Sequence, residues 1–131
     1  MENKKYTILI AEDEPSARFL YEEELRDEGY EVLTAENGLQ ALGILEDHPV
    51  DLLMTDIKMP DMHAMEMIPQ VRTDHPDLPI IVASAFKGME NDFALQGFHI
   101  SGFFSKPVPM AALKMMIQEI LRAKGAIAGA A

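Results

Sequence analysis

Hydrophobic residues follow two patterns that alternate along this chain. Short continuous apolar runs predict strands, and segments in which apolar residues recur at every third or fourth position predict helices. The runs at residues 7–11, 50–55 and 79–83 are apolar almost throughout, as expected of strands that helices cover on both faces. The alternation predicts an α/β fold with these three strands at the centre of a parallel, doubly wound sheet.

Residues with known preferences for helix ends divide the first half of the chain. Pro15 suits the first turn of a helix, and Gly29 suits the position that follows its last turn. Residues 31–35 then predict an edge strand. Asn37 suits the cap of a second helix, which His48-Pro49 ends before the next strand.

The second half continues the same alternation. A third helix is expected around residues 67–71, and Pro69 within this pattern implies that the helix starts late or is kinked. A weak fourth helix is predicted at about residues 89–96, before a short strand at residues 102–104. Apolar residues at helical spacing over residues 113–120 predict the last helix.

Size and composition are those of one soluble domain. The chain has 131 residues, of which 48% are hydrophobic, enough for a single core. We assign the domain to residues 1–124 and expect the small-residue tail at 125–131 to have no fold of its own. The N-terminus leads into a strand-length run rather than a signal-peptide core, so a cytoplasmic protein is the default expectation.

Charge and cysteine content exclude several classes of function. The 22 acidic residues exceed the 11 lysines and arginines and give a formal net charge of -11, which repels phosphate backbones and argues against direct nucleic-acid binding. There is no cysteine, and therefore no disulfide framework or thiolate metal site. The apolar runs are too short to span a membrane.

Polar residues stand at the ends of four of the five predicted strands. Glu12 and Asp13 follow the first strand, Asp56 the third, Ser84 the fourth and Lys106 the fifth. The carboxyl ends of parallel strands share one edge of the sheet, where open α/β sheets bind their ligands. Carboxylates gathered in one pocket repel each other unless a cation offsets them, and a hard divalent ion such as Mg²⁺ is suited to this role.

These residues, in this order, resemble the receiver domain of two-component response regulators, including the chemotaxis regulators. The resemblance rests on Glu12-Asp13, Asp56-Ile57-Lys58-Met59-Pro60, Ser84-Ala85 and Lys106-Pro107, and it covers residues 6–123. It implies a flavodoxin-like fold with five parallel strands in the order 2-1-3-4-5. It also implies a phosphoprotein of a two-component system or phosphorelay, which is not an enzyme in the usual sense.

The resemblance implies a phosphoacceptor and a set of metal ligands. Asp13 and Asp56 would bind Mg²⁺ directly, the backbone carbonyl of Lys58 would add a ligand, and Glu12 would act through a water molecule. Asp56 would attack phosphorus and form an acyl phosphate. Lys106 and the metal ion would balance the new charge.

The resemblance further implies a switch and a set of partners. The Ser84 hydroxyl would bind a phosphoryl oxygen, and Phe103, at a position where tyrosine is common, would turn into the vacated space. The surface of the fourth helix, fifth strand and last helix, at about residues 89–122, would change for a downstream effector protein or domain. A histidine kinase or phosphotransfer protein would donate the phosphoryl group, and many relatives dimerise through the same surface.

Two segments depart from the family pattern. Residues 59–64 read Met-Pro-Asp-Met-His-Ala where Met-Pro-x-Met-Asp-Gly is common, which leaves room for a different loop geometry. His99 stands before the fifth strand, where receivers often have glycine. Histidine is among the side chains that adopt positive φ with some frequency, so the turn is expected to be retained.

Three alternatives remain open from the residues alone. A hydrolase could use Asp56 as its nucleophile, although the acid that such enzymes often carry two residues later is replaced by Lys58. A receiver-like scaffold could bind partners without phosphorylation, although the acid set with Ser84 and Lys106 argues against this. A flavodoxin-like nucleotide module would need a glycine-rich phosphate loop after the first strand, and the sequence has none there.

Overall fold

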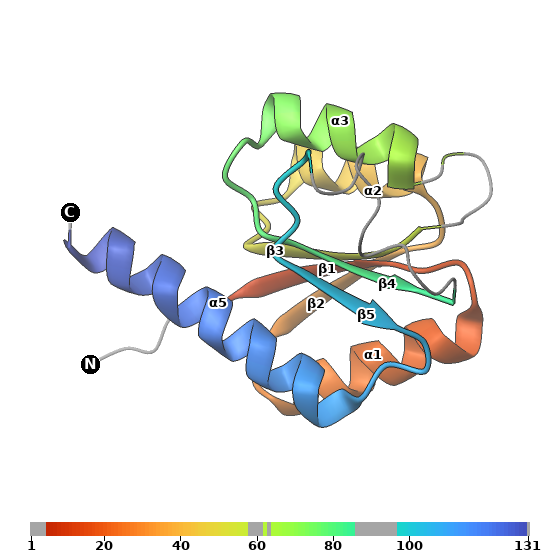
Figure 1. Ribbon diagram of the computed structural model, residues 1–131, viewed down its shortest axis with the longest axis horizontal. Helices are drawn as coiled ribbons and strands as arrows, with labels where there is room; N and C mark the ends of the chain where they lie inside the picture. Colours follow the sequence, from red (N-terminus) through yellow and green to blue (C-terminus); the bar gives the residue numbers. More distant parts are fainter. Residues whose placement is uncertain (1–4, 58–61, 63, 86–96, 131) are drawn as a thin grey trace.

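The computed structural model describes residues 5–57, 62, 64–85 and 97–130, with the backbone alone for residues 126–130. Strands and helices alternate along the chain (Figure 1). They are β1 (Thr7–Ala11), α1 (Pro15–Asp27), β2 (Glu31–Ala35), α2 (Gly38–Asp47), β3 (Leu52–Asp56), α3 (Ala64–Asp74), β4 (Ile80–Ser84), β5 (Gly102–Ser105) and α5 (Met110–Ala130). The fourth helix predicted at about residues 89–96 lies outside the described residues.

The five strands form one parallel sheet in the order β2-β1-β3-β4-β5. This confirms the predicted doubly wound, flavodoxin-like fold. The central strands β1, β3 and β4 are those with nearly continuous apolar runs, and they are buried along almost their whole length. The edge strands β2 and β5 are more exposed.

Alternate residues of the central strands enter two separate cores. In Figure 1, α1 and α5 cover one face of the sheet, and α2 and α3 cover the other. Ile8 and Ile10 of β1 belong to the same buried cluster as Leu113 of α5, whereas Leu9 belongs to the cluster that contains Met67 of α3. Burial on both faces fixes the register of each strand and therefore the position of its carboxyl end.

Side-chain caps define where the first two helices begin. The Glu14 carboxylate accepts hydrogen bonds from the backbone N–H groups of Ser16 and Ala17 at 3.2 and 2.7 Å. Asn37 Oδ1 accepts from the backbone N–H of Gln40 at 2.8 Å, which confirms the predicted cap of α2. Both caps satisfy N–H groups that the first turn of a helix leaves without intrahelical partners.

Two turns use positive φ angles. Gly29 has a φ of 93° after α1, as its predicted place beyond the helix suggests. His99 has a φ of 59° before β5, so the turn expected there is retained with histidine.

Helices α3 and α5 each differ from the prediction in one respect. Helix α3 begins at Ala64, so the late start considered for Pro69 is wrong, and the alternative, a kink at Pro69, stays a prediction. Helix α5 continues through Ala130 and includes residues 125–130, for which no fold was expected. Alanine has the highest intrinsic helix propensity, and extending an existing helix needs no new nucleus. Within the described part of the chain, no helix combines the length and apolar character needed to cross a membrane.

Candidate functional site

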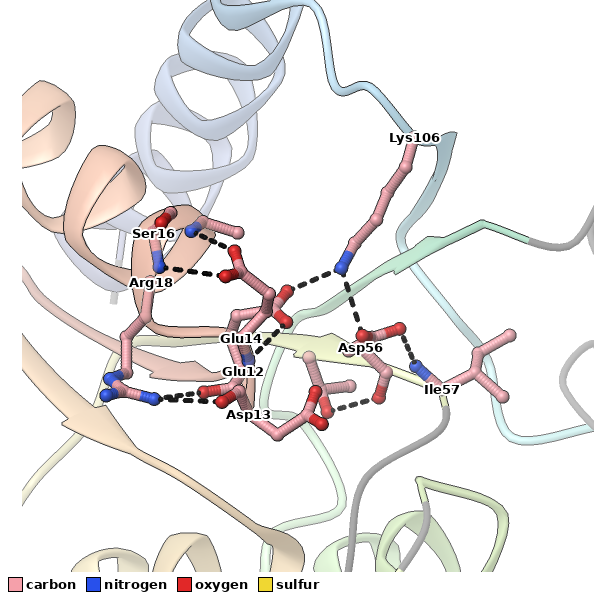
Figure 2. Close-up of polar contacts among 10 residues, drawn as sticks. Glu12, Asp13, Glu14, Ser16, Arg18, Asp56, Ile57 and Lys106 are labelled. Atoms are coloured by element: carbon pink, nitrogen blue, oxygen red, sulfur yellow. Dashed lines mark hydrogen bonds and ion pairs between the residues drawn. The ribbon is translucent and has the colours of Figure 1, made fainter.

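Three charged side chains meet at the edge of the sheet where β1, β3 and β5 end (Figure 2). Glu12 directly follows β1, Asp56 is the last residue of β3, and Lys106 directly follows β5. Neighbouring strands lie about 4.8 Å apart, and β4 separates β3 from β5. Only a long side chain spans that gap, and lysine provides one.

The ammonium group of Lys106 bridges two carboxylates. Its Nζ lies 2.7 Å from Glu12 Oε1 and 3.0 Å from Asp56 Oδ2. The side chains of Lys106, Asp56 and Glu12 are 21%, 12% and 2% exposed, so solvent screens this bridge less than an ordinary surface ion pair. The shared ammonium therefore holds the two acids at a fixed separation.

The Asp56 carboxylate is oriented through both of its oxygens. Oδ1 accepts a hydrogen bond from the backbone N–H of Ile57 at 2.7 Å, and Oδ2 faces Lys106. The preceding residue, Thr55, is buried, and its hydroxyl donates to the backbone carbonyl of Asp56 at 2.8 Å. Asp56 is thus held in one orientation at the end of a buried strand.

A third carboxylate completes an arrangement that fits a divalent cation. Glu12, Asp13 and Asp56 each offer an oxygen, and the three oxygens lie within 4.8 Å of one another. Asp13 is exposed, whereas Glu12 is buried, so the group opens to solvent on the Asp13 side. Carboxylate oxygens with an open side suit Mg²⁺, which usually binds one or two carboxylates and keeps several water molecules.

Burial and mutual charge shift the ionisation of this site. Burial raises the pKa of Glu12, and the nearby Asp56 charge adds to the rise, while the hydrogen bonds from Lys106 and from the backbone of Glu14 oppose it. Burial also lowers the pKa of Lys106, but the hydrogen bonds and charges of Glu12 and Asp56 outweigh it and raise this pKa above its ordinary value. Lys106 is therefore a permanent cation at neutral pH.

Ser84 lies on β4, next to the strand that ends at Asp56, and Phe103 lies on the edge strand β5. Ser84 is fully buried as the last residue of β4, and its carbonyl accepts a hydrogen bond from the backbone N–H of Lys106 at 2.7 Å. Phe103 lies opposite Val82 in the β4–β5 register and packs against the core on the α2 and α3 side. Because Val82 and Ser84 are two residues apart, Ser84 and Phe103 share a face of the sheet.

The structure places most of the predicted site residues together. Glu12, Asp13, Asp56 and Lys106 converge directly, and Ser84 lies at the adjacent strand end. Lys58, predicted to add a backbone carbonyl, lies outside the described residues.

Sequence reasoning missed two residues that hold the loop after β1. Glu14 caps α1, and its backbone N–H donates to Glu12 Oε2 at 3.1 Å. Arg18 donates from Nη1 to the backbone carbonyl of Glu12 at 2.9 Å. The position of Glu14 one residue before Pro15 was an available signal for the cap. Nothing in the pattern marked Arg18, because its partner is a backbone oxygen.

Two curated proteins that are similar in sequence to this chain are longer than it is. The transcriptional regulatory protein GlrR of Escherichia coli (strain K12) is 31% identical over 121 residues, which cover 92% of this chain and 27% of that protein. The response regulator GtcR of Aneurinibacillus migulanus is 36% identical over 119 residues, which cover 89% of this chain and 48% of that protein. The chain thus spans between about a quarter and a half of the length of these two relatives.

Solved structures and a family profile agree with this fold and site. The response regulator TrrA of Thermotoga maritima, solved in complex with Mg²⁺-BeF, superposes with a TM-score of 0.81 at 32% identity, covering 88% of this chain and 98% of that one. The chemotaxis response regulator CheY4 of Vibrio cholerae gives 0.82 at 26% identity, covering 89% and 99%. The profile of the response regulator receiver domain, a module of two-component signalling and not a catalytic enzyme, matches residues 8–118. The chain therefore belongs to the response regulator receiver domain family.

Proposed function

We propose that this domain is a phosphorylation-dependent switch that accepts a phosphoryl group on Asp56 from a histidine kinase or phosphotransfer protein. One observation carries the proposal: a lysine and three carboxylates, from three separate parts of the chain, lie together in one cluster. Phosphoryl transfer depends mainly on positioning and on stabilisation of negative charge. A fixed carboxylate beside a fixed ammonium group supplies both.

The two Asp56 oxygens would take different roles. Oδ1, bonded to the backbone of Ile57, would remain the carbonyl oxygen of the acyl phosphate. Oδ2 would attack phosphorus, while the bond from phosphorus to the donor nitrogen breaks and the nitrogen keeps the electron pair. Lys106 Nζ lies 3.0 Å from Oδ2, so its charge would neighbour the new phosphoryl oxygens without a large movement of the side chain.

The acidic group would hold Mg²⁺ beside this acceptor. We propose that Asp13 and Asp56 bind the ion directly, that Glu12 acts through a water molecule, and that the Lys58 backbone carbonyl adds a ligand. Bound Mg²⁺ would offset the negative charge of the phosphoryl oxygens. Asp13 is exposed, so the incoming donor would approach the acidic group from this side.

The phosphoryl group would change the conformation of the domain through Ser84 and Phe103. It adds about 1.5 to 2 negative charges at neutral pH, which is enough to bias two packings that differ by a few kcal/mol. The Ser84 hydroxyl would bind a phosphoryl oxygen, and Phe103, which is only partly buried, has room to repack. The surface at about residues 89–122 would then present a different face to an effector or to a second copy.

Incubation with acetyl phosphate and Mg²⁺, followed by intact mass spectrometry, tests this proposal. Wild type should gain one phosphoryl group, and Asp56→Asn should gain none. Asp47→Asn is the matched control, because Asp47 is an exposed acid at the end of α2, and it should behave as wild type. An unmodified wild type would favour the phosphorylation-independent scaffold, and sustained turnover of phosphate esters would favour the hydrolase.

A further inference from the structure

Arg18 binds the loop that carries two of the three acids. Its Nη1 donates to the backbone carbonyl of Glu12 at 2.9 Å and lies 3.4 Å from the carbonyl of Asp13. Figure 2 shows the guanidinium group on one side of this loop and the Asp13 carboxylate on the other, toward Asp56. The two carbonyl groups are thus turned toward Arg18, which leaves the side chains to face the pocket.

The backbone of Arg18 is held by the first turn of α1. Its backbone N–H donates to the carbonyl of Glu14 at 3.0 Å, in the first turn of α1. The Arg18 side chain is partly buried, and it reaches back from the helix to the loop that precedes it. Glu14 restrains the same loop from the other direction, through its backbone bond to the Glu12 carboxylate.

We propose that Arg18 is a positioning residue for the cation site, which it serves by holding residues 12 and 13 so that their carboxylates lie near Asp56. This inference rests on the proposed Mg²⁺ site. The two N–H groups of Nη1 are fixed in the guanidinium plane, so this one nitrogen can hold two consecutive carbonyls at once. Groups that orient metal ligands in this way commonly matter about 10- to 100-fold for metal affinity.

The charge of Arg18 and its positioning role predict opposite effects. A guanidinium group beside the pocket repels a divalent cation, so removing its charge alone should tighten Mg²⁺ binding. Removing its hydrogen bonds should free the loop, spread the carboxylates and weaken binding. The direction of the change in Mg²⁺ affinity therefore separates the two roles.

Titration calorimetry of the full chain with Mg²⁺ alone, without a phosphodonor, tests the proposal. Arg18→Met should weaken Mg²⁺ binding about tenfold. Arg18→Lys should recover part of the affinity, because its ammonium can reach a carbonyl but lacks the fixed N–H directions of the planar guanidinium group. Arg26→Met is the matched control: Arg26 lies on the same helix, pairs with Glu22 and lies 3.4 Å from the Val32 carbonyl, and its loss should leave the affinity unchanged.

Thermal unfolding of each metal-free variant shows that the titrated protein is folded. Unchanged or tighter Mg²⁺ binding by folded Arg18→Met would overturn the proposal. If Arg18→Met does not fold, Arg18→Lys decides: weaker binding than wild type supports the positioning role, and equal binding overturns it. If wild type itself binds no Mg²⁺, the proposed cation site fails and this inference fails with it. If wild type binds Mg²⁺ and Arg18→Met binds it equally well, the positioning role of Arg18 is contradicted while the proposed cation site stands.

Discussion

Asp13 is the one exposed member of the acidic group, and this makes it the simplest test of the proposed cation site. A ligand that binds only the folded state stabilises it, by about 2.7 kcal/mol at a concentration one hundred times its dissociation constant. We expect Mg²⁺ to raise the free energy of unfolding of wild type and to have much less effect on Asp13→Asn. Urea unfolding with Mg²⁺ and with EDTA measures both, and equal gains for the two proteins would contradict the assignment of Asp13 as a ligand.

Lys106 predicts a specific dependence of stability on pH. Its folded-state pKa is raised above the ordinary value of 10.5, so its contribution is fully present below pH 10.5 and is lost as the pH rises through the folded-state pKa. We therefore expect the stability advantage of wild type over Lys106→Met to shrink above about pH 10.5. Urea unfolding of both proteins from about pH 9 upward measures the difference, and a constant difference would show that the ammonium is not held by the acids.

The residues of the site differ in how far the sequence could reveal them. Glu12, Asp13, Asp56 and Lys106 stand next to apolar runs, and parallel strands bring their ends to one edge, so their convergence was predictable. The roles of these residues came from resemblance to a family. Arg18 was not predictable, because it binds backbone carbonyls and any residue type supplies those.

At the scale of elements, Arg72 ties α3 to the turn before β5. Its Nε donates to the carbonyl of Phe98 at 2.7 Å, its Nη2 to His99 at 3.2 Å and its Nη1 to His75 at 3.1 Å. Charge-assisted hydrogen bonds of this kind are the stronger ones in proteins. One side chain therefore anchors the positive-φ turn at His99 to a helix that packs on the core.

Replacing Arg72 should destabilise the fold measurably. We expect Arg72→Met to lower the free energy of unfolding by about 1 to 3 kcal/mol, because three carbonyls lose a charged donor. Arg122→Met, which removes an exposed arginine of α5, should change it by less than about 0.5 kcal/mol. Urea unfolding compares the two variants, and equal effects would show that water replaces the bonds of Arg72 without loss.

Two glycines of α2 predict opposite effects of the same substitution. A Cβ added at Gly38 would lie 2.6 Å from the carbonyl oxygen of Met62, whereas one added at Gly43 would meet nothing within 4 Å. Alanine in a helix is favoured over glycine by about 0.5 to 1 kcal/mol. Gly43→Ala should therefore stabilise the protein by about this amount, while Gly38→Ala should destabilise it because the backbone at Met62 must move.

Thermal unfolding of both glycine variants checks this pair. A shift of the same sign for Gly38→Ala and Gly43→Ala would contradict the close approach of α2 to Met62. Because Met62 lies in the connection between β3 and α3, which follows Asp56, Gly38→Ala should also alter the rate at which acetyl phosphate modifies the domain.

The elements themselves were predictable to different degrees. Strand positions followed from apolar runs, and the start of α2 followed from Asn37. The helical conformation of residues 125–130 was not anticipated, because a tail of small residues has little to bury. These residues are helical as an extension of the preceding helix, which needs no new nucleus. Pro69 was expected within the third helical pattern, but the start of α3 at Ala64 was not, because it depends on the packing of that helix, in which Met67 and Val71 are fully buried.

For the whole molecule, the candidate site depends on chain topology. Glu12 and Lys106 are 94 residues apart, and Asp56 and Lys106 are 50 apart, yet all three meet because the parallel strands end on one edge. The apolar pattern predicted which strands are central. The order of strands 2-1-3-4-5 was an expectation from family resemblance, because apolar runs alone do not distinguish one buried neighbour from another.

The central claim is that this edge makes Asp56 the acceptor of a phosphoryl group. Borohydride reduces the carbonyl of an acyl phosphate to an alcohol, so a phosphorylated aspartate is converted to homoserine and marked permanently. After treatment with acetyl phosphate and Mg²⁺, then borohydride, peptide mass spectrometry should find homoserine at position 56 and lose that signal when EDTA replaces Mg²⁺. Homoserine at another aspartate, or phosphate incorporation without homoserine at position 56, would contradict the account.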